Sequence, residues 1–225
     1  MTGALLLAGP ADARWAAGVG DILRALGLTV QTQAQALAAT PEVGLVVAGP
    51  DGASELPAWH AAGAVCAMVL PADAPAPPAQ WEPAVTRLRE PVTEAALLET
   101  LAGHHYLALS AREAAGIPDA IAEQTLGDPA FAAELVQALV NSTQDDLAQL
   151  RAAGGDLETV RSVAHRLKSS AHYVGCQSLR ALAQRLEHAA RDGDAATTAA
   201  MAAIFEPTVA RLLELLSALP GAKIK

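Results

Sequence analysis

The chain has 225 residues, enough for one large or two small domains, and a formal net charge of −9. This acidic balance argues against a nucleic-acid or anionic-membrane partner, because either would require a basic face. Hydrophobic residues make up 52% of the chain and aromatic residues only 3%, a composition that suits closely packed helices.

Targeting signals are also missing from the sequence pattern. Cys66 and Cys176 lack CxxC spacing, so no disulfide framework is predicted and a reducing compartment fits best. The first residues have no basic region before their apolar run, and no run reaches the length of a membrane span. We therefore expect a cytoplasmic protein.

Short apolar runs alternate with helical patterns over the first hundred residues. Such alternation, with strands that are apolar on both faces, indicates a parallel sheet in a doubly wound α/β domain over residues 1–105. A Pro-rich segment over 71–80 predicts a loop after the fourth strand. The strands are predicted over 4–8, 28–32, 43–48, 64–70 and 84–89, and the helices over 11–27 and 92–103.

The strand signals stop near residue 106, and a helical pattern takes over. Residues 106–117 are the least patterned piece, and we interpret them as a linker. Residues 118–225 are predicted to form an all-α antiparallel four-helix bundle, because the loops between the helical patterns are short. A short helix is predicted over 117–128, and four main helices over 129–155, 156–175, 176–193 and 194–219, with a kink at Pro207.

The helix predicted over 156–175 has two dissimilar sides. At about 100° per residue, one side is an apolar stripe made by Val160, Val163, Ala164, Leu167, Ala171 and Val174. Another side carries Arg161, His165, Lys168, Ser169 and His172. His165 is therefore expected to be mostly exposed, and an exposed neutral imidazole is a competent nucleophile near neutral pH. Lys168, one turn later, could attract a phosphoryl group as a compact positive charge.

This segment, AHRLKSSAHYVG, resembles the signature of histidine-containing phosphotransfer (HPt) domains. The resemblance covers roughly residues 118–219 and implies that His165 accepts a phosphoryl group. It also implies a role for Glu187 on the next helix, which would hold one ring nitrogen of His165. Ser169 stands where the family usually has glycine, so slower transfer or a changed partner preference is an open alternative. The matching positions are Ala164, His165, Leu167, Lys168, Ser170 and Gly175.

Other polar residues of this helix have competing interpretations. Arg161, Arg166, Ser169 and His172 are candidates for docking a partner, and the arginines could steer an acidic one. His172 is open to three interpretations: a surface residue, part of the docking face, or half of a metal site with His165. Two turns of helix separate these imidazoles by about 10.5 Å along the axis, so we expect no metal site. A hydrolytic Ser169–His165 pair is disfavoured, because no nucleophile elbow or oxyanion-hole loop accompanies it.

The order of strands and helices in residues 1–105 resembles the receiver domain of response regulators, a flavodoxin-like fold. The most specific piece is LREPVTEAALLETL, which is similar to the family's last strand and final helix. The catalytic positions depart from the family: Glu90 precedes Pro91 where a lysine is expected, and Ala48 ends the third strand in place of the phosphoacceptor aspartate. Asp12 and Asp51 do not match the motif. The resemblance therefore implies a degenerate pseudo-receiver that binds no Mg²⁺ and takes no phosphate.

Together these features predict a phosphocarrier of a phosphorelay, which takes a phosphoryl group from a receiver aspartate onto His165 and passes it to another receiver. The expected partners are receiver domains of response regulators or hybrid histidine kinases, which would supply the Mg²⁺, and the chain itself needs no cofactor. No ATP-binding motif is present, so no kinase activity is expected. By analogy, the pseudo-receiver suggests a homodimer. The alternative is a non-phosphorylated scaffold that docks or inhibits a kinase or receiver.

Overall fold

The computed structural model describes residues 3–32, 43–74 and 85–222 of the chain. The chain divides into two compact units, residues 1–105 and residues 106–225. The Pro-rich loop predicted over 71–80 lies mostly outside the described residues. Among the residues described, no helix combines the length and the apolar character needed to cross a membrane.

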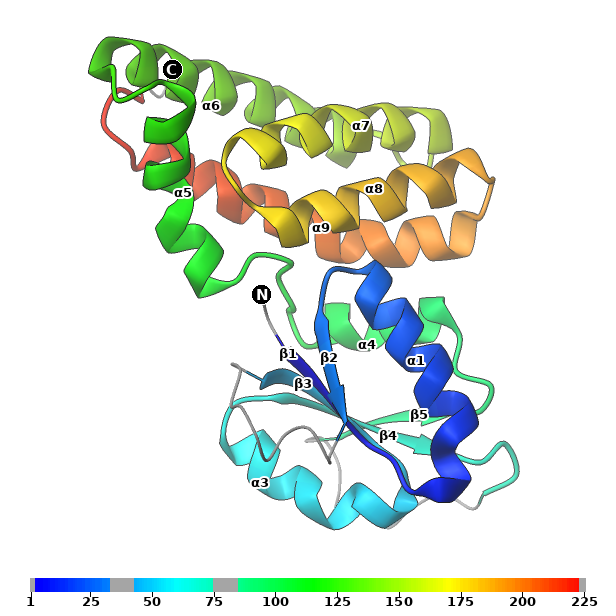
Figure 1. The fold of residues 1–225 in the computed structure, drawn as a ribbon. Coiled ribbons are helices and arrows are strands. Elements are labelled where there is room, and N and C mark those ends of the chain that lie inside the picture. Colours follow the sequence, from blue (N-terminus) through cyan, green and yellow to red (C-terminus); the bar gives the residue numbers. More distant parts are fainter. Residues whose placement is uncertain (1–2, 33–42, 75–84, 223–225) are drawn as a thin grey trace. The chain divides into compact units, whose positions relative to one another are not determined.

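The first unit is built on a five-stranded parallel sheet with the strand order β2-β1-β3-β4-β5. This is the order of flavodoxin-like doubly wound folds. Helices α1 and α4 cover one face of the sheet and α3 the other (Figure 1). The predicted doubly wound parallel sheet is thus confirmed, and it is compatible with a receiver-like fold. The elements are β1 (Gly3–Leu7), α1 (Ala13–Ala25), β2 (Thr29–Thr32), β3 (Val43–Ala48), α3 (Leu56–Ala61), β4 (Val65–Leu70), β5 (Thr86–Arg89) and α4 (Glu94–Gly103).

Alternate residues of the central strands form the core on the α3 face of this sheet. Because side chains of a strand point to opposite faces in turn, every second apolar residue reaches the same layer. Strands β1, β3 and β4 each contribute at least two such residues, and α3 contributes Leu56. The core residues on this face are Leu5, Leu7, Val46, Ala48, Leu56, Ala64, Cys66, Met68, Leu70 and Val85.

The loops after β1 and β3 pack against each other at the carboxyl edge of the sheet. Each begins with a Gly-Pro pair and continues into a 3₁₀-helix, Pro10–Asp12 and Pro50–Glu55. The Asp12 carboxylate is buried and accepts hydrogen bonds from the Gly9 N–H (2.9 Å) and the Trp15 Nε1–H (2.9 Å). A methyl group placed on Gly49 would overlap this carboxylate. Asp12 therefore fills the space beside the end of β3.

In the described part of the second unit, residues 106–222, there are five helices, of which the last four form a closed bundle. They are α5 (Ala111–Gln124), α6 (Pro129–Ala152), α7 (Leu157–Tyr173), α8 (Gln177–Arg191) and α9 (Ala195–Ser217). Helices α6 to α9 each pack on the next, and α9 returns to α6. The predicted helical bundle is therefore present, and α9 continues through Pro207, where a kink was expected. Its interior is mostly apolar and includes Phe205, Leu167 and Leu179.

Helix α5 begins at Ala111, inside the segment predicted to be a linker. Ser110 and Glu113 form a capping box, in which the Ser110 hydroxyl accepts from the Glu113 N–H and the Glu113 carboxylate accepts from the Ser110 N–H. The second oxygen of Glu113 accepts from the Ser178 N–H of α8 at 2.8 Å. Because Cys176, the N-cap of α8, provides no side-chain acceptor, Glu113 caps two helices at once.

These hydrogen bonds govern the ionisation of Glu113. Burial on its own would raise the pKa of Glu113, but the N–H groups of Ser178 and Ser110 and the Ser110 hydroxyl outweigh it and lower the pKa. The carboxylate is therefore ionised at neutral pH, and the stability it adds would be lost as the pH falls through its lowered pKa. Helix α5 is tied to α8 by this charge.

Candidate functional site

Helix α7 presents one apolar and one polar face, as its sequence predicts. It begins after Asp156, whose carboxylate accepts from the Glu158 N–H (3.2 Å) as an N-cap. It ends before Gly175, which has a φ of 71° that glycine adopts without strain. The predicted stripe from Val160 to Val174 is buried, with every side chain at most 4% exposed. This packing turns His165 outward, and its side chain is 61% exposed.

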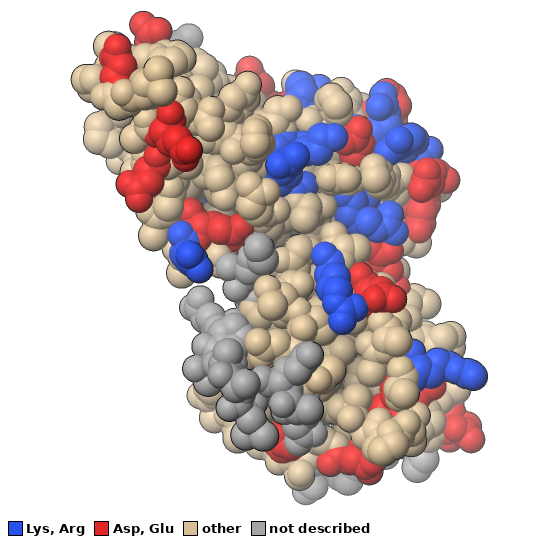
Figure 2. All heavy atoms as spheres, viewed as in Figure 1, with Lys and Arg blue, Asp and Glu red and all other residues tan. Residues whose placement is uncertain are grey.

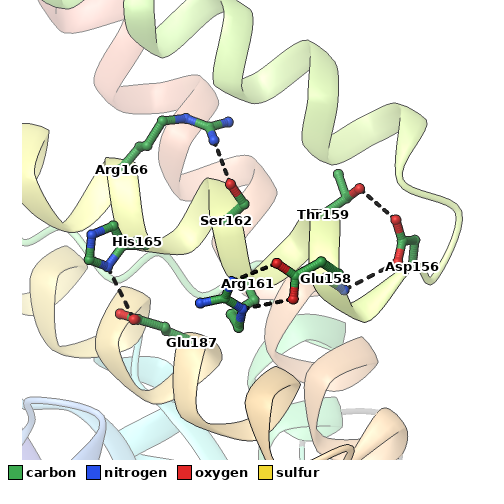
Figure 3. Close-up of polar contacts among 8 residues, drawn as sticks. All are labelled: Asp156, Glu158, Thr159, Arg161, Ser162, His165, Arg166 and Glu187. Carbon is green, nitrogen blue, oxygen red and sulfur yellow. Dashed lines mark hydrogen bonds and ion pairs between the residues drawn. The ribbon is translucent and has the colours of Figure 1, made fainter.

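Three of the predicted site residues come together across α7 and α8. His165 Nδ1 lies 3.1 Å from Glu187 Oε1, and Lys168 Nζ lies 2.8 Å from Glu187 Oε2. Figure 3 shows the His165 ring reaching from α7 to the Glu187 carboxylate on α8, with its other nitrogen pointing away from that carboxylate. The Glu187 side chain is only 12% exposed, whereas the imidazole is open to solvent.

The ionisation of Glu187 decides which ring nitrogen carries the proton. Burial would raise the pKa of Glu187, but the hydrogen bonds and charge of Lys168, with a contribution from His165, lower it. An ionised carboxylate can only accept, so Nδ1 of His165 must donate its hydrogen. The lone pair of the neutral ring is then on Nε2, the nitrogen that faces away.

Lys168 is engaged by Glu187. Its ammonium group, which the sequence suggested could attract a phosphoryl group, is 28% exposed and lies 2.8 Å from Glu187 Oε2. One oxygen of Glu187 is used by Lys168 and the other by His165. Lys168 therefore fixes the carboxylate that orients the ring.

The two arginines predicted to dock a partner are both engaged within the second unit. Arg161 pairs with Glu158, three residues earlier on α7, through two hydrogen bonds of 2.6 and 2.9 Å (Figure 3). Arg166 turns toward α6 and contacts Asp146 Oδ1 at 2.6 Å and Gln149 Oε1 at 2.8 Å. Arg161 is thus on an exposed ion pair, whereas Arg166 ties α7 to α6.

Asp146 is a residue of this region that the sequence analysis missed. Its side chain is 5% exposed, and burial raises its pKa in spite of the neighbouring guanidinium of Arg166. A signal was present in the sequence, since Asp146 occupies a position of the buried stripe of α6 between Thr143 and Leu147. An acidic residue at such a position requires a partner from another helix.

Arg166 pairs with a buried carboxylate and Arg161 with an exposed one, so their replacement should affect stability differently. We expect Arg166→Ala to lower the free energy of unfolding by about 2 kcal/mol at pH 7, because it leaves the buried Asp146 carboxylate without its cation. The loss should shrink at pH 5, where the unpaired Asp146 takes up a proton more readily. Arg161→Ala, the matched control, should leave the urea midpoint nearly unchanged, because its ion pair is exposed. Equal, small losses in both variants would contradict the role of Arg166 as a tie.

Ser169 and His172 complete the set of predicted site residues. Ser169 is exposed and lines a groove between α6 and α7 together with His165, Arg166 and Ser142. His172 is exposed two turns after His165, and its Nδ1 lies 3.4 Å from Arg180 Nη1 on α8. Both side chains are therefore exposed on the same helix as His165, and neither bonds to its ring.

Helices α7 and α8 are basic, although the chain is acidic overall. Helices α7 and α8 together carry six Arg or Lys residues and two Glu residues. Figure 2 shows basic side chains gathered over α7 and α8, whereas the face in view around α5 carries mainly acidic and uncharged side chains. Such a surface favours an acidic partner.

The arrangement at His165 is suited to nucleophilic chemistry. It provides an exposed imidazole with an oriented donor nitrogen and a carboxylate that stabilises positive charge on the ring. Within the described ranges, no three His, Cys, Asp or Glu side chains gather in a way that could hold a metal ion.

Residues 134–222 match the family model of the Hpt domain. Hpt domains are helical bundles that carry out histidine phosphotransfer in phosphorelays, and they typically interact with receiver domains or kinases. The match extends from α6 through α9 and includes His165, Lys168 and Glu187, but it does not reach residues 1–105. No curated protein and no solved structure matches the chain. The predicted HPt domain is thus confirmed for residues 134–222.

Proposed function

We propose that the chain is a phosphocarrier that accepts a phosphoryl group on His165 from the aspartyl phosphate of a receiver domain and passes it to another receiver. The observation that carries this proposal is the exposed imidazole whose Nδ1 is held by Glu187 at 3.1 Å. This leaves Nε2 as the nucleophile on the open side of the ring.

In the transfer step, the Nε2 lone pair attacks the phosphorus of the partner's aspartyl phosphate. The P–O bond to the aspartate breaks, and the carboxylate leaves with the electron pair. The ring gains positive charge as the P–N bond forms, and the Glu187 carboxylate stabilises it through the Nδ1 hydrogen. Onward transfer to a second receiver is the same step in reverse, with a receiver carboxylate as the nucleophile.

Glu187 and Lys168 act on the ring rather than on the phosphoryl group in this mechanism. Glu187 fixes the tautomer, and Lys168 holds Glu187 in its ionised form. Because the reacting oxygens carry negative charge, Mg²⁺ held by the partner receiver would neutralise them, and the chain needs no cofactor of its own. The basic surface of α7 and α8, which includes Arg161 and His172, would face the acidic site of the receiver.

For residues 1–105 we propose a receiver-like domain that takes no phosphate. The ends of β1 and β3 carry Ala8 and Ala48, which offer no carboxylate, and Glu90 follows β5 where a cation would be required. The Asp12 carboxylate is engaged by Gly9 and Trp15. Protein contact, including homodimer formation, is the proposed role of this domain.

Phosphoryl transfer can be tested with a panel of ³²P-labelled phospho-receivers incubated with the full chain. We expect label to move to the chain as an acid-labile, alkali-stable phosphohistidine, within the time in which the receiver alone keeps its label. A receiver that binds the chain tightly while no receiver of the panel transfers label would contradict the proposal and favour a scaffold.

A further inference from the structure

Ser169 lies one helical turn after His165, and both side chains line the groove between α6 and α7. Residues four apart on a helix are neighbours, with Cβ atoms about 5–6 Å apart. Arg161 and Ser169 each lie one turn from His165, on its two sides along the helix. Of these two neighbours, Ser169 is the one that lines the groove together with His165.

The Ser169 hydroxyl is exposed and has no hydrogen-bond partner among the residues that the structure describes. Two other serines at or near the groove are engaged: Ser162 accepts from Arg166 Nη1, and Ser142 donates to the Leu139 carbonyl. Ser170, which also lines the groove, is buried. The neighbouring cations are also engaged, because Glu187 holds Lys168 and Asp146 holds Arg166. Among the described residues, Ser169 therefore offers an exposed hydroxyl without a partner in the same groove as the imidazole.

We propose that the Ser169 hydroxyl donates a hydrogen bond to a phosphoryl oxygen on Nε2 of His165 and thereby prolongs the lifetime of the phosphohistidine. This inference rests on the proposed function, since it requires a phosphoryl group on His165. A phosphoryl group brings three strong acceptor oxygens and close to two negative charges. A neighbouring hydroxyl can donate a hydrogen bond to one of these oxygens.

The sign of the effect follows from the charge on those oxygens. Loss of the phosphoryl group to water passes through a loose, metaphosphate-like transition state, in which the oxygens carry less negative charge than in phosphohistidine. A hydrogen bond to them is then stronger in the ground state than in the transition state, and it slows hydrolysis. The serine therefore favours a stored phosphoryl group over one that is quickly lost.

The experiment uses the full chain and phosphoramidate as a small phosphodonor, so that no partner is needed. The P–N bond of phosphoramidate breaks, ammonia leaves, and the phosphorus bonds to Nε2 of His165. In the decay that follows, water adds to the phosphorus, the P–Nε2 bond breaks, and inorganic phosphate is released. We expect Ser169→Ala and Ser169→Gly to decay roughly 3- to 10-fold faster than wild type, and Ser169→Thr, which keeps the hydroxyl, to decay at about the wild-type rate.

Ser142→Ala is the matched control, because it removes a hydroxyl from the opposite wall of the same groove that already bonds its own helix. Its decay should equal that of wild type. Equal decay in wild type and all Ser169 variants would overturn the role of the hydroxyl and leave His165 as the acceptor. Faster decay in the glycine variant alone would also overturn it, since it would indicate a loosened helix. A wild-type chain that takes up no label would instead count against the proposed function.

Discussion

A chain with His165→Gln should take up no phosphoryl group, either from a phosphorylated receiver or from phosphoramidate. Glutamine keeps an amide that can donate to Glu187 Oε1, but it has no ring nitrogen with a nucleophilic lone pair. Because the replaced side chain is 61% exposed, the free energy of unfolding should change by less than about 0.5 kcal/mol. Label uptake and urea unfolding, measured on the same preparation, separate lost chemistry from lost folding.

The matched control for this substitution is His188→Gln. His188 follows Glu187 on α8 and is half-buried, so its replacement removes an imidazole close to the site while the His165–Glu187 pair stays intact. Label uptake in this variant should match wild type. Uptake retained by His165→Gln would show that another of the six histidines is the acceptor and would remove the basis of the proposed mechanism.

Gly49→Ala should destabilise the first unit by about 2–3 kcal/mol. The backbone of Gly49, with φ −77° and ψ 178°, is open to alanine, so the cost comes from the overlap of the added methyl group with the Asp12 carboxylate. To make room, Asp12 must give up its hydrogen bonds from Gly9 and Trp15. All three tryptophans of the chain lie within residues 1–105, so tryptophan fluorescence during urea unfolding reports on this unit.

Gly18→Ala is the control for Gly49→Ala, and it should stabilise the first unit instead of destabilising it. Gly18 lies inside α1 with no atom within 4 Å of an added methyl group, and alanine there should raise the free energy of unfolding by about 0.5–1 kcal/mol. In a double-mutant cycle, Gly49→Ala should cost little once Asp12→Ala is present, because the overlapping group is gone. A Gly49→Ala unit as stable as wild type would show that Asp12 moves aside freely.

The sheet of the first unit could be predicted from the sequence, because its strands are continuous apolar runs bounded by Gly and Pro. The contact between the loops after β1 and β3 could not be predicted in this way. Asp12 lies five residues beyond the end of β1, and only the 3₁₀-turn folds its carboxylate back onto Gly9. Sequence position placed Asp12 outside the receiver motif, and three-dimensional structure shows what it does instead.

The start of α5 was misplaced for a different reason. The sequence SARE at 110–113 is a capping-box signature, but the helix was predicted only over 117–128 and did not use this signature. A tertiary contact stabilises the earlier start of α5, because the Glu113 carboxylate accepts a hydrogen bond from the N-terminus of α8. No local pattern reveals a partner 65 residues away.

At the candidate site, the exposure of His165 and its pairing with Glu187 follow from helical periodicity and the HPt resemblance. The partners of the cations do not follow. Periodicity places Arg166 on the surface of α7, but it cannot show that α6 buries an aspartate opposite it. Whether a charge beside the ring is available to a ligand depends on such contacts between helices.

The double cap made by Glu113 has a consequence for how this protein is divided into fragments. The family match begins at residue 134, after α5, yet a carboxylate of α5 completes the first turn of α8, the helix that carries Glu187. Thr208 of α9 also accepts a hydrogen bond from the Ala108 N–H. The hydrogen bonds that complete this bundle therefore reach beyond the residues that match the family, and we expect a fragment that starts upstream of Ala108 to be more stable than one that starts at residue 134.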